Sequence, residues 1–257
     1  MNKYAMVITY DGSKYGGWQI QPNAISIQSL VEKALSTLCR QSVAVVGSSR
    51  TDANVHALGQ VVHFCAEKEV DPNKLQYNLN GILPKDIRIL QIYSTSETFH
   101  ARYSATGKVY HYHLHLDPVL DPFTLLYSWH VPYKLDLSLL RKAAQYFIGE
   151  HDFTAFANES HKGAASKNGI RTLYRVDIVE EKGGIRIEFE GNGFLYKMVR
   201  NITGTLVDIS RGRIPLEELP SIFSSKDRAR AGATAPAHGL FLVKVCYEDK
   251  NSLKEGK

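Results

Sequence analysis

The side chains best suited to chemistry lie in one short polar turn, Ser48–Ala57, which reads SSRTDANVHA. Its carboxylate is Asp52, and Arg50 precedes it by two positions. A nearby guanidinium favours the charged form of a carboxylate, and catalytic groups tend to sit on loops held by a rigid scaffold. An aspartate at a turn also commonly bonds its own backbone. The turn by itself therefore leaves catalysis and a structural role equally open.

A second polar set lies on a helix predicted from about Phe194 to Ser210. Its apolar residues recur at helical spacing: Leu195, Met198, Val199, Ile202, Leu206 and Ile209. The opposite face carries Lys197, Arg200, Asn201 and Gly204. Such a face usually contacts solvent. This one lacks acidic partners for its cations, so a polyanion or a buried carboxylate could supply the negative charge.

Tyr110 lies on a predicted strand, Lys108–Leu116, in which two kinds of side chain alternate. Tyr110, Tyr112, Leu114 and Leu116 fall on one face, and His111, His113 and His115 fall on the other. Spacing alone favours a core or edge tyrosine. The histidines could bind a metal, but no carboxylate or cysteine nearby completes a usual ligand set. The chain also lacks the glycine-rich and serine motifs of nucleotide-cofactor enzymes and serine hydrolases.

Two apolar runs that read as strands, Val43–Val46 and Val61–Phe64, flank the Asp52 turn. An earlier strand, Lys3–Tyr10, leads into a glycine-rich loop, and a helix capped by Ser26 follows. The further predicted elements are a helix from Asp71-Pro72 to about Leu79, a strand Ile87–Tyr93, a helix capped by Asp136 and closed by Gly149, a hairpin of Val176–Glu181 with Ile185–Glu190, and a last strand Leu240–Tyr247. We therefore predict an α+β fold of two similar subdomains, 1–105 and 106–247, with a polar tail at 248–257.

The composition is typical of a folded protein with a packed core and is compatible with binding to a polyanion. Of the 257 residues, 44% are hydrophobic, and the net charge is +5, a mild excess that permits such a partner. The 14 tyrosines supply rings suited to stacking on bases. No apolar run is long enough to cross a bilayer, and the N-terminus lacks the layout of a signal peptide. Three widely spaced cysteines without a CxxC pair fit a reducing cytoplasm.

Six segments, in order, resemble the TruA family of tRNA pseudouridine synthases. The family signature is close to GRTDAGVHA followed by GQV, and here it reads SRTDANVHALGQV. The other segments are YDGSKYGGWQIQPN, FHARYSATGKVYHY, GEHDFTAF, GNGFLYKMVRNITGTL and TAPAHGLFL, so the match runs from about Tyr10 to Leu242. Ser49 and Asn54 replace two of the family's glycines. Because both are small or tolerate a left-handed backbone, we expect the turn to survive.

The resemblance implies a reaction in which uridine in tRNA becomes pseudouridine: the N1–C1′ bond breaks, the uracil turns over, and C5 bonds to C1′. The implied targets are the uridines at positions 38, 39 and 40 in the anticodon stem-loop. Asp52 matches the family's catalytic aspartate, as a nucleophile or as the base of a glycal route. Arg50 lies in the same signature and Arg200 matches a further basic residue, and we expect one or both to hold the Asp52 carboxylate ionised. Tyr110 matches the active-site tyrosine, which would stack on the uracil and help to remove the C5 proton.

The resemblance also implies the pseudouridine synthase fold, with a mostly antiparallel central sheet lining an RNA-binding cleft, and a cytoplasmic homodimer that needs no cofactor and no metal. Lys197, Asn201, and Lys14 and Tyr15 of the DGSKYGGWQ loop are expected to bind the tRNA. Phosphate contacts from these groups and from the KGAASKNG loop would make binding salt-sensitive. Flipping a base out of its stem costs a few kcal/mol, and aromatic stacking offsets about 1–3 kcal/mol per base.

Two other classes of protein stay open on the sequence. An RNA-binding module that has lost catalysis would keep the basic loops and Tyr110 but would not need Asp52. A metal-dependent hydrolase built on His111, His113 and His115 would lose its activity on chelation.

Overall fold

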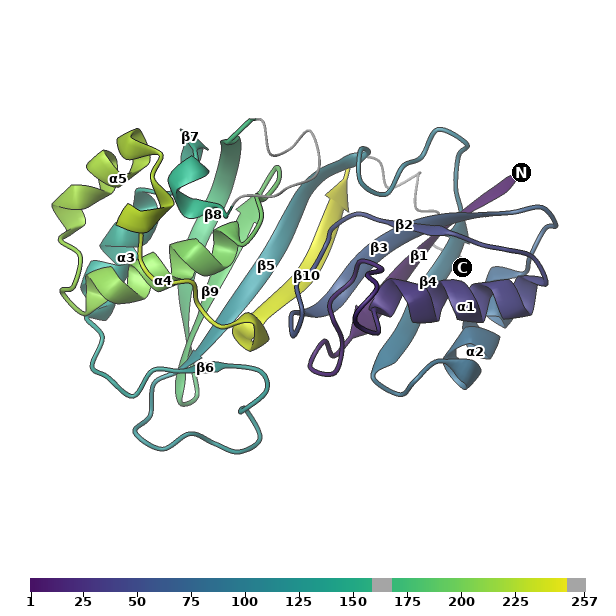
Figure 1. Cartoon of the computed structure of the whole chain (residues 1–257), viewed down its shortest axis with the longest axis horizontal. Coiled ribbons are helices and arrows are strands. Elements are labelled where there is room, and N and C mark those ends of the chain that lie inside the picture. Colours follow the sequence, from purple (N-terminus) through teal and green to yellow (C-terminus); the bar gives the residue numbers. More distant parts are fainter. Residues whose placement is uncertain (159–167, 249–257) are drawn as a thin grey trace. The chain divides into compact units, whose positions relative to one another are not determined.

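The computed structural model describes residues 1–158 and 168–248 of the chain (Figure 1). Its contacts divide the chain into two compact units: unit 1 is Met1–Gly107 with Phe241–Lys257, and unit 2 is Lys108–Leu240. Most of the KGAASKNG loop and of the predicted polar tail lies outside the described residues. No helix of the two described stretches is long and apolar enough to span a membrane.

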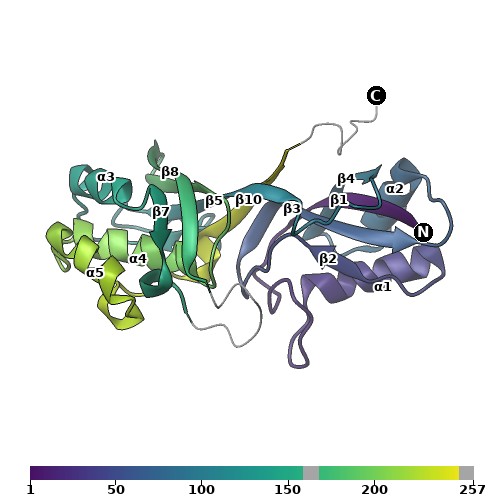
Figure 2. The same cartoon turned by 90° about the horizontal axis from the view of Figure 1, so that it is seen from above.

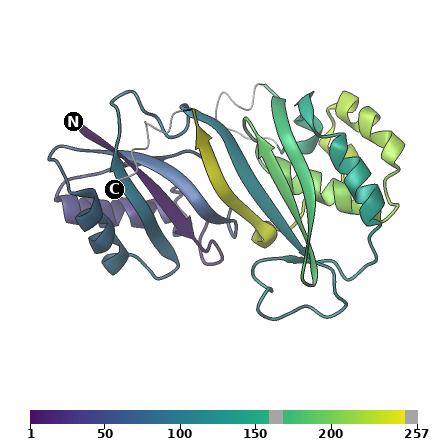
Figure 3. The ribbon, with the colours of Figure 1, turned by 180° about the vertical axis from the view of Figure 1, so that it is seen from behind.

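Unit 1 is built on a sheet with the strand order β4-β1-β3-β10. These strands are β1 (Asn2–Tyr10), β3 (His56–Ala66), β4 (Ile87–Ser94) and β10 (Leu240–Tyr247), and the short β2 (Val45–Gly47) pairs with β3. β1 runs antiparallel to both β3 and β4, whereas β10 runs parallel to the start of β3 (Figure 3). The helices α1 (Ile27–Cys39) and α2 (Pro72–Ile82) pack against each other, and α2 also contacts β4.

Unit 2 is built on a sheet with the strand order β5-β9-β8-β7, in which all neighbours are antiparallel. Its strands are β5 (Ala105–His115), β7 (Gly149–Asp152), β8 (Ile170–Glu181) and β9 (Gly184–Gly191), with the short β6 (Trp129–His130) parallel to β5. Figure 2 shows the helices α3 (Leu137–Gln145), α4 (Met198–Ser210) and α5 (Leu219–Ser225) gathered on one side of this unit. Short 3-10 turns lie at Thr154–Phe156, Leu216–Glu218, Arg228–Arg230 and Ala237–Gly239.

The predicted α+β class and its mostly antiparallel pairing are confirmed. So are the two expected helix caps, because the side chains of Ser26 and Asp136 each accept a hydrogen bond from the first turn of their helix. Asp71, predicted as the start of a helix, caps α2 in the same way. The hairpin is confirmed as well: Gly183 takes a φ of +76°, as a tight turn between β8 and β9 requires.

Two predicted helix boundaries are wrong, and in each case the backbone gives the reason. α4 begins at Met198 instead of Phe194, because Lys197 takes a left-handed conformation with a φ of 60° that a right-handed helix cannot include. α3 ends at Gln145, and Gly149 starts β7 with a φ of +107° instead of closing the helix.

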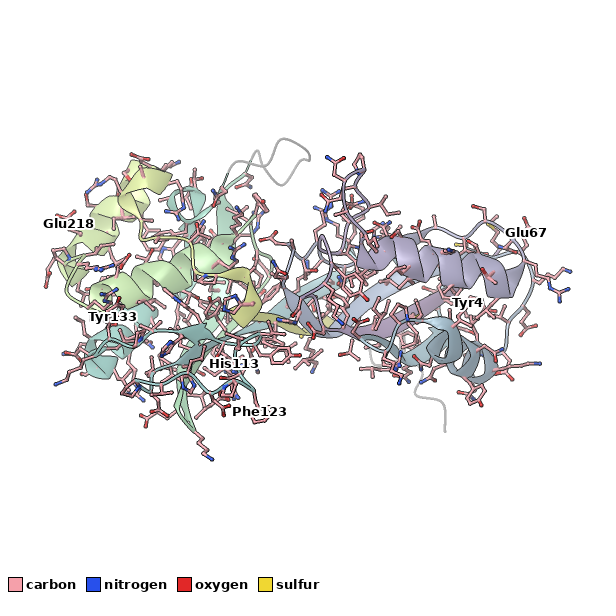
Figure 4. The ribbon with its side chains drawn as sticks, turned by 60° about the horizontal axis from the view of Figure 1, so that its bottom comes forward. Tyr4, Glu67, His113, Phe123, Tyr133 and Glu218 are labelled. Carbon is pink, nitrogen blue, oxygen red and sulfur yellow. The ribbon has the colours of Figure 1, made fainter. Side chains whose placement is uncertain are left out.

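The histidine face of β5 bears glutamate partners. His113 Nδ1 lies 3.0 Å from Glu181 Oε2, and His111 Nε2 lies 3.7 Å from Glu188 Oε1 (Figure 4 labels His113). Burial lowers the pKa of both histidines although the nearby carboxylates act in the opposite direction. Within residues 1–158 and 168–248, no three His, Cys, Asp or Glu side chains form a group that could hold a metal ion.

Candidate active site

The Asp52 turn joins the end of β2 to the start of β3 and is tied to the sheet just before the aspartate. The Thr51 hydroxyl lies 2.7 Å from the Tyr10 hydroxyl at the end of β1. The Thr51 carbonyl accepts a hydrogen bond of 3.0 Å from the Trp18 amide. Because the hydroxyl and the carbonyl of Thr51 are both hydrogen-bonded, the backbone that enters Asp52 has a fixed direction.

The glycine-rich loop after β1 lies directly on this turn. Gly17 has a φ of +93°, and a Cβ there would stand 2.5 Å from the Thr51 carbonyl oxygen and 2.8 Å from the Asp52 carbonyl carbon. A Cβ on Gly12 would stand 2.1 Å from the Val55 carbonyl oxygen. No side chain fits between the two backbones, so the loop needs glycine at these positions.

Asn54 adopts the left-handed conformation that the sequence predicted it would tolerate, with a φ of 65°. The turn closes through a hydrogen bond of 3.2 Å from the Val55 amide to the Asp52 carbonyl. Ser49, the other replacement of a family glycine, is buried, and its hydroxyl has no hydrogen-bond partner in the described parts of the chain. Its carbonyl accepts a bond of 2.8 Å from Gln60 Nε2.

The predicted site residues of unit 1 lie on the turn and on the loop that covers it. Asp52 is half-buried, whereas Arg50 is exposed. Among the described residues, the Arg50 guanidinium makes no ion pair, so the expected contact with Asp52 is not seen. Tyr15 is buried, and its hydroxyl donates a hydrogen bond of 2.5 Å to Asp86. Burial and this hydrogen bond raise the pKa of Tyr15. Lys14 extends into solvent, and its Nζ lies 3.9 Å from Asp86.

Tyr110 lies on β5 in unit 2 and faces the core side of the sheet. Only 7% of its surface is exposed, and its ring meets the Phe194 ring edge-on at 4.9 Å between centroids. Two positions further along the strand, Tyr112 is fully buried and donates a hydrogen bond of 2.7 Å to the Pro236 carbonyl. The alternation predicted for this strand is therefore confirmed, with both tyrosines on one face.

Arg200 stands in the first turn of α4 and is oriented by the backbone of Ala235. Its Nε donates a hydrogen bond of 2.8 Å to the Ala235 carbonyl, and its own carbonyl accepts one of 3.1 Å from the Ala235 amide. One residue before the helix, the Lys197 ammonium lies 5.1 Å from the centroid of the Tyr196 ring. These two cations mark the beginning of the helix.

The polar face predicted for α4 is in fact internal from Asn201 onward. Asn201 is fully buried and donates to the Phe156 carbonyl at 2.9 Å and to Asn158 Oδ1 at 3.0 Å. Its Oδ1 accepts from Arg228 Nη2 at 3.0 Å and from Thr234 Oγ1 at 2.7 Å. The ordinary interpretation of this face as solvent-exposed is therefore wrong.

The segment that covers this face was missed by sequence reasoning. A Cβ on Gly204 would stand 1.6 Å from the Ala233 carbonyl oxygen, so the segment Arg228–Ala235 runs directly along the helix. Asn201 holds this segment through Arg228 and Thr234, and the segment in turn orients Arg200 through Ala235. The available signal was Gly204, because a glycine has no Cβ and leaves room for another backbone to approach closely.

The chain matches a family model described as tRNA pseudouridine synthase over residues 6–104 and 143–248. It is 54% identical over 252 residues to tRNA pseudouridine synthase A 1 of Protochlamydia amoebophila, with 98% of each chain covered. It is 44% identical over 248 residues to tRNA pseudouridine synthase A of Chlamydia muridarum, covering 95% of this chain and 92% of the relative. The same protein of Ruminiclostridium cellulolyticum is also 44% identical over 248 residues, with coverage of 96% and 100%.

An α+β fold with matches of this extent defines the class of the protein as a pseudouridine synthase, an isomerase that acts on tRNA. Within that class, the chain belongs to the TruA family. The resemblance predicted from the six sequence segments is thereby confirmed.

The left-handed Asn54 gives a test of the turn. We expect Asn54→Gly to keep both stability and pseudouridine formation, because glycine adopts a positive φ without strain. Asn54→Val should lower the free energy of unfolding by about 1–2 kcal/mol, the cost of a left-handed backbone for an ordinary residue, and should reduce activity. Urea unfolding and a pseudouridine assay measure both effects. Ala53→Val, a neighbour without a positive φ, is the matched control, and equal stability of all three variants would contradict a strained turn.

Proposed function

We propose that this enzyme converts uridine to pseudouridine at positions 38, 39 and 40 in the anticodon stem-loop of tRNA, with Asp52 as its catalytic carboxylate. The observation that carries the proposal is the anchored turn. Thr51 is bonded through its hydroxyl and its carbonyl, Gly17 lies against the backbone, and the Asp52 side chain stays half-buried at the tip. Such fixation is what a group needs if it is to meet one atom of a substrate.

The reaction needs an ionised carboxylate on either of its two routes. In one route Asp52 attacks C1′ as the N1–C1′ bond breaks, and in the other it removes the C2′ proton so that a glycal forms. The freed uracil then turns over. C5 bonds to C1′ as the bond between C1′ and the carboxylate breaks in the first route, or as the proton returns to C2′ in the second. The C5 proton then leaves while N1 gains one. No electrons are exchanged with another molecule, so the atoms balance within the nucleoside.

Two further groups are assigned to this chemistry. We assign Arg200 to orienting and stabilising the Asp52 carboxylate, because Ala235 already fixes the direction of its guanidinium and a nearby cation favours the charged form of an acid. We assign Tyr110 to stacking on the uracil and to removal of the C5 proton. Its buried ring, braced edge-on by Phe194, is preorganised for such contact.

The remaining predicted residues are assigned to RNA binding or to support. The exposed side chains of Arg50 and Lys14 are assigned to phosphate contacts, with Lys14 exchanging its 3.9 Å contact with Asp86 for a phosphate. Lys197, which lies beside the ring of Tyr196 at the start of α4, is assigned to the same role. The hydrogen bond from Tyr15 to Asp86 assigns Tyr15 a structural role, which is to fix the loop that carries Lys14. Asn201 uses its whole amide inside unit 2 and is assigned to positioning Arg200.

The family resemblance supports two more proposals, that the enzyme works as a homodimer whose second copy completes the tRNA surface and that it acts in the cytoplasm. Neither bears on the chemistry of Asp52.

The Asp52 carboxylate can be removed with little change of shape. We expect Asp52→Asn to lower the rate of pseudouridine formation at least about 100-fold, since an amide can neither attack nor take a proton, while the affinity for tRNA persists. Single-turnover assays and filter binding measure the two quantities. Glu67→Gln, which removes an exposed carboxylate of unit 1, should behave as the unchanged enzyme. Full activity of Asp52→Asn would contradict the assignment and favour a different catalytic group.

The Tyr110 hydroxyl can be tested against that of Tyr112. Tyr110→Phe should slow the chemical step while the free energy of unfolding stays the same. Tyr112→Phe should instead lower the free energy of unfolding by about 1 kcal/mol, because it deletes the bond to the Pro236 carbonyl, and should leave the single-turnover rate unchanged. If Tyr110→Phe is fully active, its hydroxyl has no role and only the ring matters.

A further inference from the structure

The FHARYS segment between β4 and β5, Phe99–Ser104, has no part in the chemistry described so far. It forms a compact turn in unit 1. His100 closes that turn: its Nδ1 accepts hydrogen bonds of 3.2 Å from the amides of Arg102 and Tyr103. The His100 amide donates to the Ser104 hydroxyl at 3.0 Å, and the Ser104 amide donates to the His100 carbonyl at 2.9 Å.

The turn is also fastened to the sheet beneath it. The Ala101 amide donates a hydrogen bond of 3.1 Å to Nδ1 of His63, a buried residue of β3. The Ala101 carbonyl accepts one of 2.7 Å from the Tyr247 hydroxyl on β10. On the other flank, Lys3 Nζ donates to the Phe99 carbonyl at 3.0 Å. The segment is therefore held in one conformation from three strands.

Three rings rise from the sheet in a short column. The rings of His63 and His100 are 4.7 Å apart between centroids, and those of His100 and Tyr103 are 4.3 Å apart with an interplanar angle of 31°. The column begins at a buried histidine and ends at Tyr103, which is 77% exposed. A large ring this exposed, yet supported from below, presents a fixed aromatic surface to solvent.

The charge of this surface comes from Arg102, whose guanidinium carbon lies 5.9 Å from the Tyr103 ring centroid. Burial lowers the pKa of His100. Burial and the neighbouring His100 together lower the pKa of His63 to about 4. Both histidines are therefore neutral near pH 7. Among the described residues, no carboxylate lies within ion-pair distance of Arg102. Its charge is thus available to an anion outside the protein.

We infer that Tyr103 and Arg102 form a nucleotide-binding platform, in which Tyr103 stacks on an unpaired base of the tRNA and Arg102 binds the adjoining phosphate. A flat exposed ring beside an uncompensated guanidinium is the chemistry that recognises single-stranded nucleotides. Because His100 fixes both residues through their backbone amides, little ordering is needed on binding. The inference rests on the proposed action on the anticodon stem-loop, whose loop bases are unpaired.

The test compares tRNA affinity across matched variants. Stacking is worth about 1–3 kcal/mol per base, so Tyr103→Ala should weaken tRNA binding by roughly 5- to 150-fold, while Tyr103→Trp should bind as the unchanged enzyme does. Arg102→Ala should lower the slope of log Kd against log salt by about one unit, the loss of one phosphate contact. Tyr77→Ala is the control, because Tyr77 is 81% exposed on α2 of the same unit.

A second readout separates this inference from the proposed function. With tRNA at saturation, the single-turnover rate of pseudouridine formation in Tyr103→Ala should equal that of the unchanged enzyme, which marks a binding role. Affinity equal to that of Tyr77→Ala would overturn the platform, and so would a loss of affinity that Tyr103→Trp does not restore. If the modified uridines lie outside positions 38–40 but Tyr103→Ala still weakens binding, the target assignment fails and the platform stands.

Discussion

The candidate site depends on one close contact between two backbones. The glycine-rich loop after β1 lies on the turn that carries Asp52, with no room for a side chain at Gly17 or Gly12. Thr51 completes the contact by bonding to Tyr10 and Trp18. These bonds fix the backbone that enters Asp52, because they are made by the residue just before it. A side chain carried on a backbone held in this way has a defined position, which is what the proposed catalytic role requires.

In unit 2, Arg200 is likewise oriented by hydrogen bonds to a neighbouring segment. The buried amide of Asn201 makes four hydrogen bonds and holds the segment that passes over α4, and Ala235 of that segment orients the guanidinium. The FHARYS turn is fixed in a similar way: His100 and His63 accept hydrogen bonds from its backbone amides, while the side chain of Tyr103 stays exposed. In each of the three places, hydrogen bonds made by one residue fix the backbone of a residue close to it in the chain or in space.

Local signals in the sequence predicted much of this structure. The strands around the Asp52 turn, the helix caps and the alternation of β5 follow from hydrophobic period and from residues that bond their own turn. The left-handed Asn54 could also be predicted, because a family glycine stands there. Gly204 left room for a second backbone at α4, but the sequence did not show which segment lies there, since the cover comes from residues 228–235, which are remote along the chain. Tyr10, which bonds the Thr51 hydroxyl, is 41 residues away. Hydrophobic periodicity does not predict such a long-range pair.

The central claim is that this chain isomerises specific uridines of the anticodon stem-loop. The most direct test maps pseudouridine, at single-nucleotide resolution, in unmodified tRNA treated with the purified protein, with Asp52→Ala as the control. The account predicts pseudouridine at positions 38, 39 and 40 wherever a uridine stands there, and none with the control. Pseudouridine confined to other positions, or formed equally by the control, would contradict it.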